Sequence, residues 1–401
     1  MAEIVMSAET LYLTGLCARE RGLVGAIPSE PGPGFDWAGF VEAADRHKVL
    51  GLAYSAFSSG RSPSPPTEIL ARLKREAASK AAAKAMLIAE WRRVDEVLRG
   101  ASIRVMMIKG PALALQLYGD PGAREFRDID ILVDAGSLKQ AGEAFTSIGY
   151  EEISLFPEFG RAKQKVLNRA SHHTAFKKRG IPAYFEVHGT NDKDIGIAPI
   201  GIEEAFERSQ GLRFEGIPFP TLERNDHALF VLLHGARHRW CALQWILDAA
   251  VMLEGPPLRL DSGPIRSWGG VDPRYALDSF ALFAGRLFAL PFLDRFQPPP
   301  GPRMKRARSI VTSVFEQFAE GATDTKNYKT AINRSIAITR LQRRFIPKLR
   351  AWSWIVTPSL NDFRFFRSAN LPIFVYYFLR PFFVLVRFAR RFAGRIRAMP
   401  I

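Results

Sequence analysis

The sequence predicts an α+β protein: an α/β core with a small mixed sheet, flanked by N-terminal and C-terminal helical regions. Apolar runs rich in strand-forming residues, separated by turn signals, are concentrated in residues 99–220. The segments on either side show mostly helical periodicity. Hydrophobic residues make up 47% of the chain, which is enough for a full core and excludes a disordered protein.

The chain has 401 residues, enough for two or three domains. A proline-rich stretch at residues 297–302 is typical of a linker. We therefore expect four regions: an N-terminal helical region at 1–98, the core at 99–220, a helical region packed on the core at 221–300, and a basic helical C-terminal region at 301–401.

The N-terminal region carries helical periodicity at residues 40–47 and 69–98. The second of these segments has an apolar stripe that we expect to pack on the core and to which we assign no chemistry. The stripe consists of Met86, Leu87, Trp91, Val94 and Leu98.

The core is organised around residues 103–134, which predict strand, turn, helix, loop and strand. An apolar run at 103–108 forms the first strand and ends at Lys109 and Gly110. Pro111 suits the first turn of a helix, because its missing N–H would lack a helical partner there. The second strand is predicted at 126–133.

Asp128 and Asp130 lie two residues apart on the second strand, so their side chains share one face. Two adjacent carboxylates repel each other, and a divalent cation is a common reason for such a pair. The alternative is a solvent-exposed strand end with two acids that have no ligand. Short motifs of this kind match frequently by chance.

A third acid, Glu186, follows on a later predicted strand. Residues 174–177 and 183–188 flank a glycine-containing turn and predict a hairpin. Glu186 is followed by Val187 and His188 on the second strand of this hairpin. The alternative is a half-exposed hairpin with alternating polarity.

Helical sequence returns after residue 221. His234 and His238 lie at i, i+4 on one helix face, a spacing that also occurs in zinc sites. No clear third ligand follows, and packing or substrate contact is favoured over metal binding. Asp248 has three roles open to it: a helix cap, an ion pair with Arg237 or Arg239, or support of the site.

The combination of Gly110, Arg124 and Arg127 with the Asp128-Ile-Asp130 strand resembles the nucleotidyltransferase superfamily built on a polymerase-beta-like core. More narrowly, the string IKG…Y…R…DIDILV, over about residues 80–260, is similar to a bacterial family described as uncharacterised nucleotidyltransferases. The acid–apolar–His triplet at Glu186 is also similar to that family. The superfamily's Gly-Ser is replaced here by Gly110-Pro111, and the gap to the acidic pair is longer.

The resemblance implies a sheet of the nucleotidyltransferase type and transfer of an NMP from an NTP to the hydroxyl of a small molecule, peptide or protein. It implies Mg²⁺ or Mn²⁺ bound by the catalytic residues Asp128, Asp130 and Glu186. It further implies nucleotide contacts from Lys109, Gly110, Arg124, Arg127 and His188. Two alternatives stay open: a non-catalytic nucleotide-binding scaffold, and a peripheral membrane protein acting on an envelope substrate.

Residues 301–401 hold 20 Lys and Arg but only four Asp and Glu, so this region accounts for the whole net charge of +16. From Phe382 to Arg397 arginines and apolar residues separate onto two sides of a helix, which suits a membrane surface or packing on the protein. Nucleic acid is not excluded on charge, although no recognisable motif supports it.

Cys17 and Cys241 lie far apart and form no ligand cluster, which fits a reducing compartment. The first residues lack the basic and apolar segments of a signal peptide. We therefore expect a cytoplasmic protein, or one that is peripheral at the inner face of the membrane.

Overall fold

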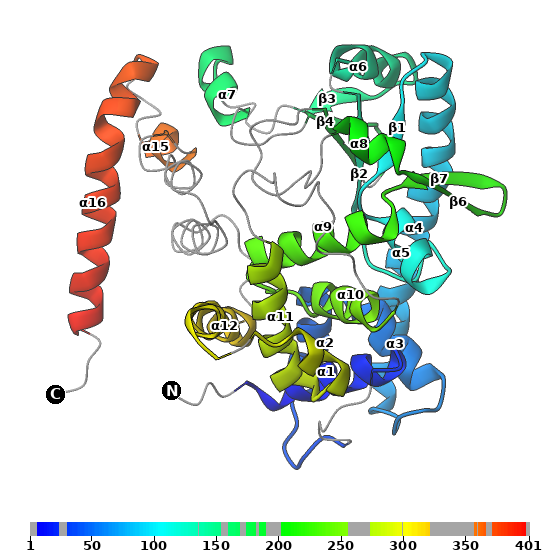
Figure 1. Cartoon of the computed structure of the whole chain (residues 1–401), viewed down its shortest axis with the longest axis vertical. Helices are drawn as coiled ribbons and strands as arrows, with labels where there is room; N and C mark the ends of the chain where they lie inside the picture. The colour runs from blue at the N-terminus through cyan, green and yellow to red at the C-terminus, as the bar shows by residue number, and fades with distance from the viewer. Residues whose placement is uncertain are drawn as a thin grey trace.

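The computed structural model describes residues 6–23, 30–134, 136–153, 159–168, 174–181, 184–189, 202–255, 273–298, 300–320, 357–358, 360–365 and 371–397. Helices flank a mixed seven-stranded sheet, which confirms the predicted α+β fold (Figure 1).

The sheet has the strand order β3-β4-β5-β2-β1-β7-β6. The pairs β2–β5 and β1–β7 are parallel, and the other neighbours are antiparallel. The strands are β1 (Val105–Met107), β2 (Asp128–Val133), β3 (Glu151–Ile153), β4 (Thr174–Lys177), β5 (Tyr184–His188), β6 (Gln210–Phe214) and β7 (Ile217–Thr221).

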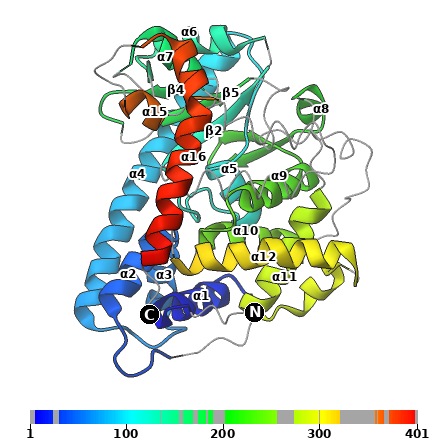
Figure 2. The ribbon, with the colours of Figure 1, turned by 90° about the vertical axis from the view of Figure 1, so that its left-hand side faces the viewer.

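A helical lobe lies at one end of the sheet, at the bottom of Figure 2. Two segments that are far apart in the sequence share one hydrophobic core there, because residues 12–73 and 228–318 contribute to the same cluster. The lobe contains α1 (Ala8–Glu20), α2 (Trp37–Arg46), α3 (Leu50–Ser58), α9 (Arg224–Arg237), α10 (Leu243–Glu254), α11 (Pro273–Phe288), the 3₁₀ helix η2 (Pro291–Phe296) and α12 (Pro302–Glu320).

The 34-residue helix α4 (Thr67–Gly100) connects the helical lobe to the sheet. At 1.5 Å per residue it is about 50 Å long, so one rigid element can contact both parts. Of its predicted stripe, four residues are buried, but Met86 is 44% exposed, so that part of the prediction was wrong. Met86 precedes Leu87 by one position, which turns it about 100° away from the buried line.

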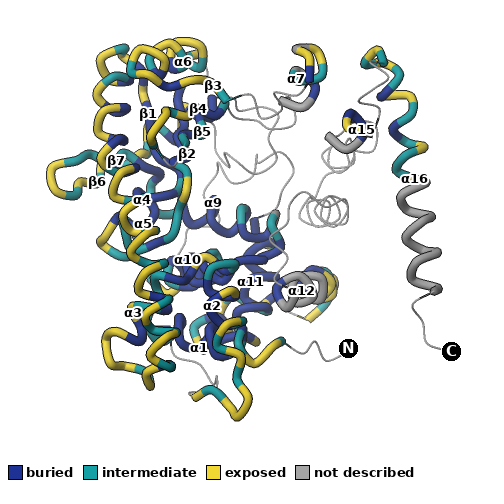
Figure 3. Tube along the Cα trace, turned by 180° about the vertical axis from the view of Figure 1, so that it is seen from behind, coloured by how far each residue is buried: buried dark blue, intermediate teal, exposed yellow. Residues whose placement is uncertain are grey.

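One face of the sheet is covered by α4 and α6 (Leu138–Ser147). Ile129, Ile131 and Val133 of β2 point to this side and pack with Trp91 and Phe145 in one cluster. Because side chains alternate along a strand, the neighbouring residues of β2 point to the opposite face. Figure 3 shows the central strands β1 and β2 as largely buried along their length.

The opposite face of the sheet carries the acidic residues and a smaller apolar cluster. Leu132 packs there with Ile202 of α8 (Ile202–Glu207) and with Phe230 of α9. Helices α8 and α9 thus cover one part of this face, adjacent to Asp130.

The predicted turn after β1 has the backbone conformation that requires glycine. Gly110 has φ 63° and ψ −132°, and α5 (Pro111–Tyr118) begins directly after it. Few residues other than glycine adopt this region. The helix ends at Gly119, which is left-handed with φ 72°.

The hairpin of β6 and β7 was not predicted. Pro218 and Pro220 lie within β7, although proline cannot donate to a sheet ladder and argues against a strand. The strand is tolerated because its contact with β1 is limited to one residue pair, Met107 with Thr221, where the Thr221 hydroxyl also donates to the Met107 carbonyl.

The C-terminal part contains α15 (Leu360–Phe365) and α16 (Ile373–Arg397), which pack with α7 (Arg161–Asn168) around Phe363 and Tyr376. Arg380 of α16 forms a buried ion pair with Asp362 at 2.8 Å. The side chains of residues 386–397, which include the predicted arginine-rich face, lie outside the described residues. Among the helices described, none combines the length and apolarity needed to cross a bilayer.

Candidate active site

The parallel pairing of β2 and β5 brings the predicted acids together. Asp130 lies opposite Glu186 in the register, and Asp128 lies opposite Tyr184. Directly opposed residues share a face, and residues two apart on a strand do so as well. Asp128, Asp130, Glu186 and His188 therefore all lie on the face away from α4.

Three of these side chains form a compact group. The potential ligand atoms of Asp130, Glu186 and His188 all lie within 4.8 Å of one another. His188 Nε2 is 3.2 Å from Asp130 Oδ1, and both residues are buried. Two carboxylates and an imidazole within this distance form a donor set that fits a divalent cation. Asp128 lies outside the group of three but on the same face.

Lys109 supplies a positive charge to this group. Its Nζ donates to Asp130 Oδ1 at 2.8 Å, and the side chain of Asp130 is only 3% exposed. Lys109 lies two residues after the end of β1, and the N–H of the intervening Ile108 donates to the Asp130 carbonyl at 3.0 Å. This bond holds Lys109 beside the carboxylate that it contacts.

The carboxylates differ in their protonation equilibria. Burial opposes ionisation of Asp130, but Lys109 and His188 outweigh burial and hold the pKa of Asp130 well below its usual value. Burial, followed by repulsion from Asp130, raises the pKa of Asp128. Burial, followed by the charges of both aspartates, raises the pKa of Glu186 to about 8. Excess negative charge in a desolvated site favours a bound cation.

The two predicted arginines occupy different environments. Arg124 is buried and its Nε donates to Asp248 Oδ2 at 2.7 Å. The side chain of Arg127 is 80% exposed, and it lies 3.9 Å from the carboxylate of Asp45. Among the roles left open for Asp248, the ion pair exists, but its partner is Arg124. The Tyr118 hydroxyl also donates to Asp248, at 2.7 Å.

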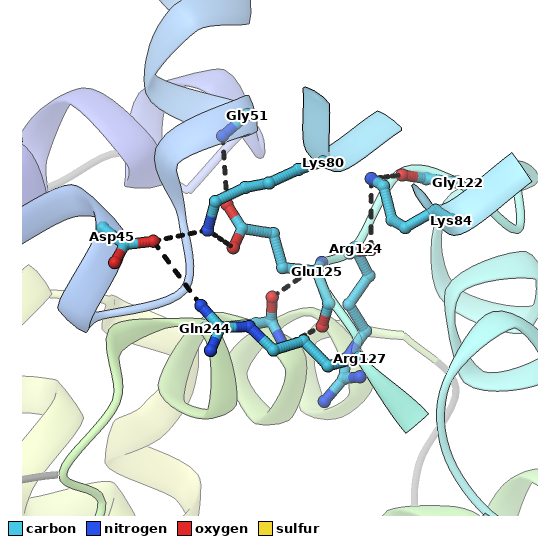
Figure 4. A network of polar contacts seen from close by, with 9 residues as sticks. All are labelled: Asp45, Gly51, Lys80, Lys84, Gly122, Arg124, Glu125, Arg127 and Gln244. Atoms are coloured by element: carbon cyan, nitrogen blue, oxygen red, sulfur yellow. Dashed lines mark hydrogen bonds and ion pairs between the residues drawn. The ribbon is translucent and has the colours of Figure 1, made fainter. Parts of the chain in front are cut away.

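The loop before β2 is held on both sides by polar contacts (Figure 4). Gln244 of α10 makes two hydrogen bonds to the backbone of Glu125, one from its amide and one to its carbonyl oxygen. Lys80 of α4 bridges Glu125 and Asp45 at 2.7 and 2.5 Å. Lys84 donates to the carbonyls of Gly122 and Arg124. These contacts fix where β2 begins, and therefore where Asp128 lies.

Lys48 was missed by the sequence analysis. It lies between α2 and α3 with φ 60°, and its ammonium is 5.4 Å from the centre of the Trp245 ring. Lys48 keeps contact with solvent, yet desolvation by the surrounding protein lowers its pKa, and the charge of Asp128 opposes this shift. Only tertiary folding brings residue 48 near residue 128, so no local pattern indicates it.

His234 and His238 are packed with aromatic rings. Their own rings are 4.6 Å apart, and each lies close to the Trp245 ring, at 5.0 and 5.3 Å. Within the described part of the chain, the group that fits a metal ion is the one around Asp130 and does not include this pair. The structure thus favours the packing interpretation.

A sheet with paired acids on one face, a glycine turn after its first strand and a nearby lysine defines the class of nucleotidyltransferase-like folds. A family model described as uncharacterised nucleotidyltransferase matches residues 33–263, more than half of the chain. The chain belongs to this family, which confirms the resemblance seen in the sequence. No curated protein and no solved structure gives a significant match.

Proposed function

We propose that the protein is a metal-dependent nucleotidyltransferase that moves an NMP from an NTP to an acceptor hydroxyl. The observation that carries this proposal is the convergence of Asp130, Glu186 and His188 within 4.8 Å, with Asp128 on the same face. Family membership supports a role in nucleotidyl transfer. We also propose the division of the chain into four regions: the core at 99–220 carries this site, and the regions at 1–98, 221–300 and 301–401 surround the core.

Asp128, Asp130 and Glu186 are proposed to hold Mg²⁺ or Mn²⁺, because both ions prefer carboxylate oxygens. When bound, such an ion neutralises phosphate charge and polarises the phosphoryl oxygens. The ring N–H of His188 donates to the ionised carboxylate of Asp130 and orients it. Lys109 and the backbone N–H groups after Gly110 are proposed to bind the phosphates, with Arg127 adding positive charge from the loop.

The proposed step is an in-line substitution at the α-phosphorus of the NTP. A bond forms from the acceptor oxygen to this phosphorus, the bond to the bridging oxygen breaks, and pyrophosphate leaves. Glu186 is proposed to orient the acceptor hydroxyl and to accept its proton. Arg124 is proposed to act through position: its ion pair with Asp248 holds the loop that leads into Asp128.

The test is incorporation of α-labelled NTP into candidate acceptors, with Mg²⁺ or Mn²⁺, by the wild type and by the double variant Asp128→Asn, Asp130→Asn. We expect transfer to fall at least 10³-fold in the double variant, since both charged ligands are lost. Asp134→Asn is the matched control, because Asp134 binds Arg104 away from the site. Equal transfer by the double variant would exclude this site. NTP binding without transfer to any acceptor would favour a non-catalytic scaffold.

A second proposal concerns the membrane, and an exposed stripe on α16 supports it. In the described residues, five of the six exposed large hydrophobic side chains lie on this helix: Phe374, Tyr377, Phe378, Phe382 and Leu385. Their spacing places them on one side of the helix. The basic residues of 301–401 provide attraction to anionic headgroups. We propose peripheral attachment at the inner face of the membrane through α16, including the segment from Phe382 to Arg397.

Flotation with vesicles containing phosphatidylserine tests the attachment. We expect the full chain to float with anionic vesicles, and Phe378→Ser with Phe382→Ser to reduce flotation at least fivefold, because two exposed apolar anchors are lost. The control Met86→Ser removes an exposed apolar residue from α4 instead. If the α16 variant floats as well as the wild type, the attachment through this stripe is wrong.

A further inference from the structure

A cavity of about 500 Å³ lies between the N-terminal helices and the loop before β2. Its walls come from α3, α4, the end of α5, the loop at residues 119–125 and α10. The volume lies in the range of small-molecule binding sites.

The acids that line the cavity already have partners. Glu20 accepts from Ser55 and Arg61, and Glu125 is paired with Lys80. In the same way, Asp248 binds Arg124 and Tyr118, while Asp120 accepts from the backbone of its own turn. Their negative charge is therefore largely balanced within the protein.

Among the described residues, four cationic side chains that line the cavity have no such charged partner. In the portion of the chain described, Arg21, Lys48, Lys74 and Lys84 form no ion pair with a carboxylate within 4 Å. Arg21 stacks on the Tyr118 ring at 3.5 Å and donates to a backbone carbonyl. Lys84 likewise donates to backbone carbonyls. The cavity therefore has a surplus of positive charge.

Two residues that line the cavity also interact electrostatically with the carboxylate site. Lys48 and Arg124 line the cavity, and both act electrostatically on Asp128. Helix α5 runs from Gly110, beside Asp128, to Tyr118, which lines the cavity. Eight residues of helix span about 12 Å, so α5 has its first end beside Asp128 and its last residue, Tyr118, in the cavity wall.

We propose that this cavity binds the acceptor and that the acceptor is a small polyol carrying an anionic group, a phosphate monoester. This inference rests on the proposed nucleotidyl transfer and selects a small molecule over a peptide or protein acceptor. The surplus cations would bind the phosphate, as charge-assisted hydrogen bonds to phosphate are strong. The hydroxyl of the polyol would then extend from the side of the cavity lined by Lys48 and Arg124, the lining residues that act on Asp128.

Calorimetry on the full chain with glycerol 3-phosphate and with glycerol, without NTP or metal, tests the binding site. We expect glycerol 3-phosphate to bind and glycerol not to bind. Lys48→Gln and Lys74→Gln should each weaken binding at least fivefold. Lys139→Gln is the control, because its side chain is 92% exposed on α6 and remote from the cavity. Equal binding by the wild type and both cavity variants would overturn the proposal.

A competition experiment separates this inference from the proposed function. We expect Mg²⁺ and a non-hydrolysable NTP analogue to leave the affinity for glycerol 3-phosphate unchanged or to increase it. Displacement by the analogue would mean that the cavity is the nucleotide site, and the acceptor proposal would fail while nucleotidyl transfer stood. If glycerol 3-phosphate binds but no labelled NMP is transferred to any acceptor, the proposed function fails and an anion site remains.

Discussion

Lys109 Nζ lies 2.8 Å from Asp130 Oδ1, so the protein places its own cation on the most buried carboxylate of the site. His188 contacts the same oxygen at 3.2 Å. Asp130 is therefore kept ionised inside a desolvated site, where an unpaired carboxylate would be costly. Under the proposed function, the phosphates of a bound nucleotide would contact the same lysine.

Lys109→Met should lower the free energy of unfolding by about 3 kcal/mol in metal-free buffer, because Asp130 loses its charged partner. Added Mn²⁺ or Mg²⁺ should then raise the melting temperature more in the variant than in the wild type, since the ion replaces the missing charge. Urea unfolding and thermal denaturation with and without metal measure both effects. Lys139→Met, at an exposed position, is the control. An equal metal effect in both proteins would contradict a metal site at Asp130.

Arg124→Met should destabilise the protein by about 3–5 kcal/mol, because Asp248 would remain charged and buried. Adding Asp248→Asn to this variant should recover part of the loss, since the amide removes the unpaired charge. Tyr118→Phe removes one hydrogen bond from the same carboxylate and should cost about 1 kcal/mol. Urea unfolding of these three variants and of Asp248→Asn alone gives these values. Additive losses in the double variant would show that the pair is not coupled.

Part of the site could be predicted from sequence because its signals are local. Asp128 and Asp130 alternate with apolar residues on one strand, and that pattern alone predicts a shared face. The hairpin that carries Glu186 was likewise indicated by its turn. The convergence of Glu186 with the aspartates was implied by the family resemblance, and it depends on the parallel pairing of β2 with β5, which no local pattern predicts.

The remaining features depend on contacts between distant segments. Asp248 finds Arg124 across 124 positions, and Lys48 approaches Asp128 only after the helical lobe has packed on the sheet. Periodicity contains no information about such partners. The strand β7 was missed for a different reason: its two prolines oppose a strand in any local analysis, and pairing with β6 overrides them.

Gly110→Ala should destabilise the protein by about 1–3 kcal/mol, because alanine is strained at φ 63° and ψ −132°. A clash is not the cause, since an added Cβ would lie 3.5 Å from the nearest atom, the Asp128 carbonyl oxygen. Gly100→Ala is the control, with no atom within 4 Å of an added Cβ and no positive φ. Urea unfolding compares the two. An equal change in stability for both variants would show that the Gly110 backbone is not under this constraint.

Two buried histidines connect the helical lobe to the sheet and to α10. His227 Nε2 lies 3.1 Å from the Ile108 carbonyl, directly before Lys109, and His47 Nδ1 accepts from the Leu243 N–H. Burial lowers the pKa of each to about 3, with smaller contributions from Arg124 at His227 and from Arg46 at His47. Both imidazoles are therefore neutral in the folded protein at neutral pH.

The two histidines should reduce the stability of the folded protein as the pH falls from about 6.5 towards 3. In this window the unfolded chain binds protons at both histidines and the folded chain does not, so each contributes a slope of about 1.4 kcal/mol per pH unit. Below pH 3 both states are protonated and this contribution no longer changes. His227→Gln keeps a donor near the Ile108 carbonyl, and His47→Asn keeps an acceptor for Leu243. In each variant the free energy of unfolding should therefore depend less steeply on pH, by the contribution of one histidine. Urea unfolding at pH 7, 6, 5 and 4 measures this dependence. A variant whose pH dependence matches that of the wild type would show that its histidine is protonated in the folded state.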